Sequence, residues 1–142
     1  MWRRCKQLGV AQLGDGLVGL PADARTREQL DWVAEQIVKF GGTAGVWLSH
    51  PATAGQEHDL AAGMAQARAA EYRGVIEAVT AAGREPAEVR RRVLRRLRTQ
   101  WRAIDRRDFF PPPDREQARQ ALAQLASAST TEEQPAGNLA AP

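Results

Sequence analysis

The sequence of 142 residues contains one cysteine, only two lysines and few aromatic side chains. A single cysteine, Cys5, excludes an intrachain disulfide framework and is typical of a reducing compartment. The chain has no run of about eighteen apolar residues, and it does not open with a charged and then apolar leader. We therefore expect a cytoplasmic protein that does not act in a membrane.

The motifs of common enzyme classes are also missing. Gly14-Asp15-Gly16 lacks the spacing and the following helix of a dinucleotide-binding loop. His50 and His58 have no cysteine near them, so they do not form a recognisable metal site. No serine stands in a nucleophile elbow and no pair of carboxylates stands out. We therefore expect no metal, cofactor or catalytic residue, and we do not expect an enzyme.

The first twenty residues predict a short helix followed by a β-hairpin. Apolar residues recur at helical spacing at Trp2, Cys5 and Leu8. Gly9 then stands where a left-handed helix stop is expected. Two short apolar runs, 10–13 and 17–20, flank Gly-Asp-Gly, whose glycines tolerate the positive φ of a tight turn. A helix and a hairpin therefore open the chain.

The next thirty residues predict a helix and a strand. Thr26 is the expected N-cap, an apolar stripe runs over residues 30–40, and Gly41-Gly42 ends the helix. Residues 43–49 are β-branched and aromatic enough for a strand. The order matches a ferredoxin-like βαββαβ unit that lacks its first strand, so we predict an α+β fold. It suggests a chain shortened at its N-terminus, with an exposed sheet edge through which a homodimer can form.

The remainder of the chain predicts helices. Residues 56–82 and 86–107 show helical periodicity and are joined by a short connection, which predicts an antiparallel helical hairpin. Residues 116–126 predict a last short helix, and residues 127–142 lack apolar bulk and predict a disordered tail. We thus expect one domain over residues 1–126, with an incomplete ferredoxin-like part (1–50) and a helical part (56–126).

Arginine is concentrated in one segment. Between Arg84 and Arg107 ten arginines face only three carboxylates, a local balance of +7 in a chain whose net charge is +3. The planar guanidinium group suits phosphates and tetrahedral oxyanions, because it donates two parallel hydrogen bonds. A solvated helix face is the simpler alternative. The residues that we expect to contact an anion are Arg3, Arg4, Arg91, Arg95, Arg98 and Arg102, the last four of which share one helix face.

An ordered set of short motifs resembles the N-terminal domain of the chromate resistance protein ChrB. The set covers about residues 1–125 and consists of Trp2-Arg3-Arg4, Gly9, Asp15-Gly16, Leu20-Pro21, Trp32, Gly41-Gly42, Glu71-Tyr72 and Arg107-Asp108-Phe109-Phe110. Compared with that family, the chain lacks the opening strand, the first half of the first helix and the second domain. Four of the matched aromatic residues are expected in the core, namely Trp2, Trp32, Phe109 and Phe110.

The resemblance implies a role in chromate resistance, as a chromate-responsive regulator. The first hypothesis, which adds the charge of the arginine-rich helix, is a transcriptional regulator that contacts DNA through this helix. A second hypothesis is a small oxyanion-binding accessory protein of chromate resistance, which binds chromate or sulfate without contacting DNA. A third is a truncated remnant without function. The sequence leaves these three alternatives open.

Overall fold

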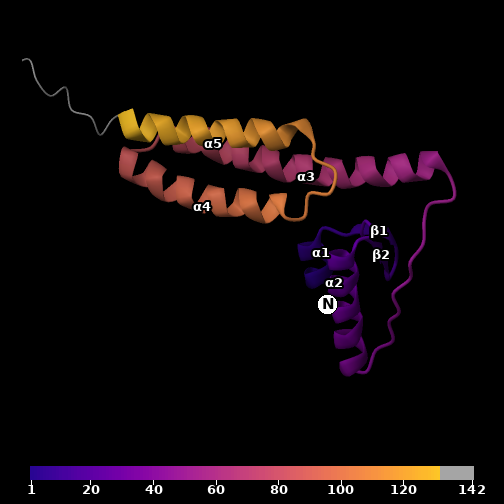
Figure 1. The fold of residues 1–142 in the computed structure, drawn as a ribbon. Helices are drawn as coiled ribbons and strands as arrows, with labels where there is room; N and C mark the ends of the chain where they lie inside the picture. The colour runs from indigo at the N-terminus through magenta and orange to yellow at the C-terminus, as the bar shows by residue number, and fades with distance from the viewer. Residues whose placement is uncertain (132–142) are drawn as a thin grey trace, which may run out of the picture. The chain divides into compact units, whose positions relative to one another are not determined.

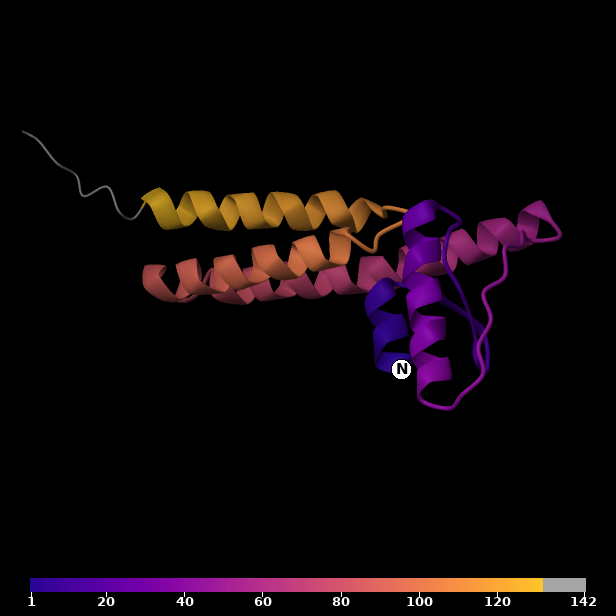
Figure 2. The same ribbon diagram turned by 60° about the horizontal axis from the view of Figure 1, so that its bottom comes forward.

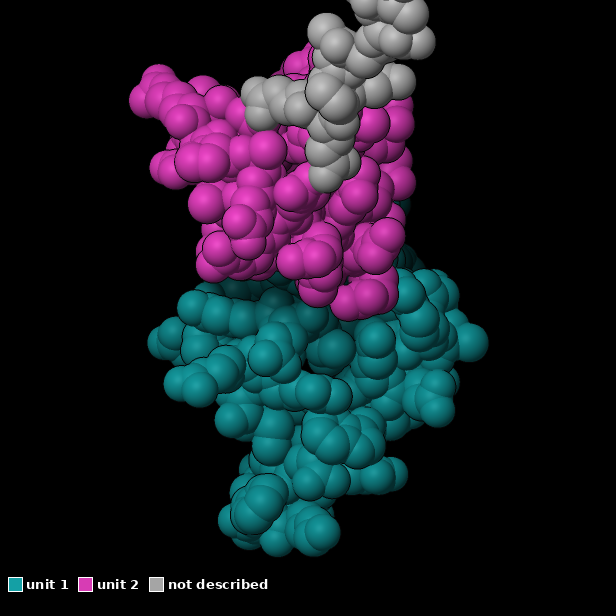
Figure 3. Space-filling model, turned by 90° about the vertical axis from the view of Figure 1, so that its left-hand side faces the viewer, with its two compact units in different colours: residues 1–67, 107–110 teal, residues 68–106, 111–142 magenta. Residues whose placement is uncertain are grey.

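The computed structural model describes residues 1–131. Over this range the chain forms five helices and one two-stranded antiparallel sheet (Figure 1, Figure 2), which confirms the predicted α+β class. The chain divides into two compact units (Figure 3). Unit 1 contains residues 1–67 and 107–110, and unit 2 contains residues 68–106 and the described chain from residue 111.

Unit 1 begins with the predicted helix and hairpin. Helix α1 (Trp2–Leu8) ends at Gly9, whose φ of 77° is left-handed. Strands β1 (Ala11–Gly14) and β2 (Leu17–Gly19) pair antiparallel, with an irregularity in register before the turn. Gly16 has a φ of 75°, so the turn uses the conformational freedom that only glycine has without strain. The positive φ angles of Gly9 and Gly16 therefore determine the end of α1 and the hairpin turn.

Helix α2 (Ala24–Lys39) begins earlier than predicted, because its N-cap is Asp23 and not Thr26. The Asp23 carboxylate accepts a hydrogen bond from the Thr26 backbone N–H at 2.8 Å, and the Thr26 hydroxyl accepts one from the Asp23 backbone N–H at 3.1 Å. The bond from the Thr26 backbone also lowers the pKa of the Asp23 carboxyl group. Thr26 is thus the third residue of a reciprocal capping box, and its side chain is buried.

The strand predicted over residues 43–49 is wrong. The chain between α2 and α3 (Ala54–Ala82) has no regular secondary structure there, and all of residues 43–49 are exposed. A strand is stable only when a neighbour accepts and donates its backbone hydrogen bonds, and no strand within residues 1–131 does so for this segment. The ferredoxin-like part of the prediction is therefore not confirmed within residues 1–131.

Unit 2 is built from three helices that lie side by side (Figure 1, Figure 2). They are the second part of α3, α4 (Ala87–Asp105) and α5 (Pro113–Thr131). Their apolar faces meet in one core cluster, which contains Tyr72, Val75, Ala82, Leu94, Leu97, Ile104, Ala118, Leu122 and Leu125. The predicted helical hairpin is thus part of a three-helix bundle, and the third helix is longer than expected.

Helix α5 continues past the predicted end at residue 126. Ser129 lies in phase with the buried residues Leu122 and Leu125, and it is itself buried. Its hydroxyl donates a hydrogen bond of 2.8 Å to the Leu125 carbonyl oxygen, which satisfies the buried polar group within the helix. The predicted disordered tail is therefore wrong for residues 127–131, and the rest of it lies outside the described residues.

Replacing Leu97 by alanine should destabilise unit 2. The Leu97 side chain is almost fully buried in the core cluster, and removing such a leucine typically costs about 2–5 kcal/mol. Urea unfolding followed by circular dichroism measures the change. Gln100→Ala, at an exposed position of the same helix, should change the free energy of unfolding by less than about 0.5 kcal/mol. Equal effects of the two variants would contradict the described core.

Candidate functional site

Helix α4 has two chemically different sides. The residues that face the bundle recur at three- and four-residue spacing, as Leu97, Trp101 and Ile104 show. Six arginines are exposed, five on the remaining surface of the helix and one, Arg106, at its C-cap. We call this set the arginine face, and it contains Arg92, Arg95, Arg96, Arg98, Arg102 and Arg106. The burial of one side therefore fixes the other side as a dense cationic surface.

The arginine face is not neutralised by the described protein. Within residues 1–131, the structure pairs no carboxylate with any of its six guanidinium groups. Neighbouring like charges on one helix destabilise it modestly, and the field of such a cluster attracts anions. The surface can therefore bind a polyanion through charge-assisted hydrogen bonds.

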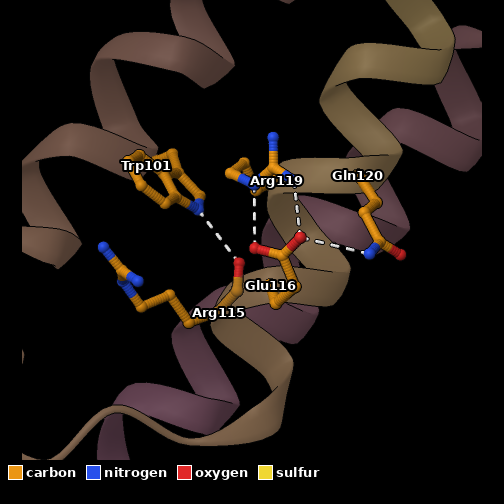
Figure 4. Close-up of polar contacts among 5 residues, drawn as sticks. All are labelled: Trp101, Arg115, Glu116, Arg119 and Gln120. Carbon is orange, nitrogen blue, oxygen red and sulfur yellow. Dashed lines mark hydrogen bonds and ion pairs between the residues drawn. The ribbon is translucent and has the colours of Figure 1, made fainter.

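Arginines on α5 are paired with carboxylates, in contrast to the six of the arginine face. Arg115 donates from Nε to Asp105 Oδ1 at 2.6 Å, and its guanidinium lies 5.4 Å from the ring centroid of Trp101. Arg119 donates from Nε to Glu116 Oε2 at 2.8 Å (Figure 4). The indole Nε1 of Trp101 also donates to the Arg115 carbonyl oxygen at 3.4 Å. The contacts of Arg115 with Asp105 and Trp101 join α5 to α4, whereas Arg119 and Glu116 pair within α5.

The carboxyl group of Glu116 is kept ionised by its partners. Hydrogen bonds from Arg119 lower its pKa to about 2, and a bond from Gln120 acts in the same direction (Figure 4). The same pairing raises the pKa of Arg119. Glu116 is therefore already matched with a cation on its own helix.

Two arginines of the basic segment have roles that the sequence did not reveal. Arg90 is buried, and its Nη1 donates to the Glu85 carbonyl oxygen at 3.1 Å, which fixes the turn between α3 and α4. Arg91, expected to contact an anion, is only half-exposed and is already engaged in an interaction. Arg95, Arg98 and Arg102 are exposed on α4, and their contact with an anion stays a prediction. Helical periodicity predicts which arginines share a face, but it does not show which of them are held by contacts within the protein.

Arg3 and Arg4 belong to unit 1, whereas the arginine face belongs to unit 2. Both are exposed, and the Arg4 guanidinium stacks 4.8 Å from the ring centroid of Trp32. The Lys6 Nζ lies over the Trp2 ring, 5.6 Å from the ring centroid. Trp2 and Trp32 are 44% and 45% exposed, so their expected place in the core is wrong. Trp2 lies on α1 and Trp32 lies on α2.

Phe109 and Phe110 are also not core residues. Phe109 is half-buried under the guanidinium of Arg25, which lies 6.0 Å from the Phe109 ring centroid, and Phe110 is 38% exposed.

The other matched pair, Glu71-Tyr72, has a structural role on α3. Glu71 pairs with Arg68 at 2.9 Å, and Tyr72 is fully buried in the bundle core.

The described elements define an α+β protein that exposes an unneutralised basic helix. The family model for the N-terminal part of protein ChrB matches residues 1–91, and the chain belongs to this family. Its family associates it with chromate resistance. No curated protein and no solved structure matches the chain. Among residues 1–131, no helix is both long and apolar enough to span a membrane.

The family match ends inside α4. It includes Arg3, Arg4 and Arg91, whereas Arg95, Arg98 and Arg102 follow it. The whole arginine face, from Arg92 to Arg106, is therefore a property of this chain that the family match does not itself cover.

Replacing Arg119 by glutamine should raise the pKa of Glu116 from about 2 towards its ordinary value of 4.5, because the main hydrogen-bond donor is lost. The folded-state pKa of the native pair lies below the ordinary value. Its contribution to stability is therefore present above about pH 4.5 and is lost as the pH falls towards 2. NMR titration of the Glu116 side chain measures the shift. Arg98→Gln should leave it unchanged, and a native Glu116 that titrates near 4.5 would refute the pairing.

Proposed function

We propose that the protein is a chromate-responsive transcriptional regulator that contacts DNA with the arginine face of α4. The observation that carries the proposal is the set of six exposed guanidinium groups that no carboxylate within residues 1–131 neutralises. Membership of the ChrB family supplies the link to chromate resistance. The DNA contact rests on the charge and exposure of α4.

The dimensions of the arginine face suit a nucleic-acid backbone. Arg92 and Arg102 are ten residues apart, so they are separated by about 15 Å along the helix axis. One DNA strand carries a phosphate about every 3.4 Å along its axis, so several phosphates lie within this length. Each guanidinium group donates in a planar fork that matches two phosphate oxygens. Binding would also relieve the repulsion among the arginines.

The same guanidinium groups are able to bind chromate. Chromate is a tetrahedral dianion whose oxygens accept the bonds that phosphate oxygens accept. A chromate ion held between two guanidinium groups would take them away from the DNA backbone. We therefore expect chromate to weaken the binding of DNA.

Binding to a mixed-sequence DNA duplex should fall steeply as salt rises, because each neutralised phosphate contributes about 0.9 to the slope of log affinity against log salt. Fluorescence anisotropy at a series of salt concentrations measures this slope. Arg95→Gln and Arg98→Gln should each reduce the slope by about 0.9. Arg119→Gln is the matched control, since it removes the same charge from an arginine that Glu116 already pairs. A flat salt response of the native protein would refute the DNA contact.

Isothermal calorimetry with chromate, and with sulfate as the control oxyanion, tests the second part of the proposal. We expect heat on addition of chromate, and a smaller signal in Arg95→Ala and Arg98→Ala than in the native protein. Added chromate should also lower the anisotropy of a bound duplex. Chromate binding without any duplex binding would instead identify an oxyanion-binding accessory protein. No binding of either anion would contradict both functions.

A further inference from the structure

The segment between α2 and α3 is unusually apolar for an exposed stretch of chain. No charged residue occurs from residue 40 to residue 49. Three large side chains in this segment are between 79% and 85% exposed, namely Phe40, Trp47 and Leu48. Soluble monomers rarely leave such contiguous apolar surface in water, and it commonly marks a site of protein interaction.

The β-hairpin of unit 1 has outer strand edges that lack a neighbouring strand in the described chain. Strands β1 and β2 pair only with each other in the described chain, so each leaves an outer edge of backbone N–H and C=O groups without a strand beside it. Leu13 and Leu17 on this hairpin are about half exposed. The only charge from residue 10 to residue 20 is Asp15, which lies in the turn. Natural edge strands usually carry charges or proline against pairing, and these strands carry neither.

We propose that two copies of this chain form a dimer, in which residues 43–49 of each copy add as a strand to the hairpin of the other. Each copy supplies both an open sheet edge and a strand-forming segment that lacks a neighbour. A reciprocal exchange therefore satisfies both copies at once and closes into a two-fold dimer. The identity of the partner follows from this self-complementarity, and the inference does not depend on the proposed function.

The available area is sufficient for a stable dimer. Phe40 and Trp47 are aromatic side chains, each of which buries roughly 150–250 Å² when it is covered. In two copies these four side chains supply roughly 600–1,000 Å². Leu13, Leu17 and Leu48, together with the backbone of the added strands, bring the total to the order of 1,200 Å², the lower limit of a specific interface.

Size-exclusion chromatography with light scattering on the full chain tests the dimer. We expect a mass of twice 15.6 kDa at tens of micromolar protein. Trp47→Lys and Leu17→Lys should each return the mass to that of one chain, because a charge at a strand edge opposes pairing. Gln124→Lys, at an exposed position on α5, adds the same charge elsewhere and should remain dimeric. Unchanged helical circular dichroism shows that each variant is folded.

Hydrogen exchange supplies the second measurement. Backbone amides of residues 43–49 should exchange slowly in the native dimer and rapidly in Leu17→Lys, although this substitution lies in a different segment. A native protein that is monomeric at this concentration would overturn the proposal. So would a dimer that survives both lysine substitutions, or an assembly that grows without a fixed size, since reciprocal exchange closes at two copies.

Discussion

The amphipathic division of α4 is the constraint on which the rest of unit 2 depends. One side of this helix supplies Leu94, Leu97 and Ile104 to the three-helix core. Because the positions that face the core, such as Leu97, Trp101 and Ile104, recur at three- and four-residue spacing, the intervening arginines must point away from the bundle. Two carboxylates of α4 and α5 are already matched, Asp105 with Arg115 and Glu116 with Arg119. Packing and charge pairing together therefore leave the arginine face to solvent or to an external anion.

The two units differ sharply in how much apolar surface they bury. In unit 2, nine buried residues from three helices form one cluster. Among the described residues of unit 1, the buried apolar side chains are those of Cys5 and Val33. Trp2, Trp32 and Trp47 remain substantially exposed. Since apolar burial is the main driving force of folding, unit 1 is the part with most to gain from a further surface. This imbalance favours association through unit 1 and ligand binding through α4.

Features that depend on neighbouring residues were predictable from sequence. Gly9 and Gly16 require positive φ, so the end of α1 and the hairpin turn were found correctly. The strand over residues 43–49 was not, because a strand exists only through a distant partner, which local composition cannot supply. The cap of α2 was misplaced for a different reason. Asp23 and Thr26 bond reciprocally, and either residue alone is a good cap. Similarly, periodicity placed Arg95, Arg98 and Arg102 on one face, but the burial of Arg90 depends on the geometry of a turn.

Family membership and physical chemistry support different parts of the proposed function. The family match covers unit 1's helices and hairpin and the start of α4, which is the part that connects the chain with chromate resistance. All six residues of the arginine face follow the match, so family membership alone gives no reason to assign them a DNA contact. That contact follows from six cations that the described protein leaves without carboxylates. The proposed strand exchange lies wholly within the matched residues, in unit 1. Dimerisation and anion binding therefore rest on different residues and different forces, and a charge change at Arg98 should affect only the second.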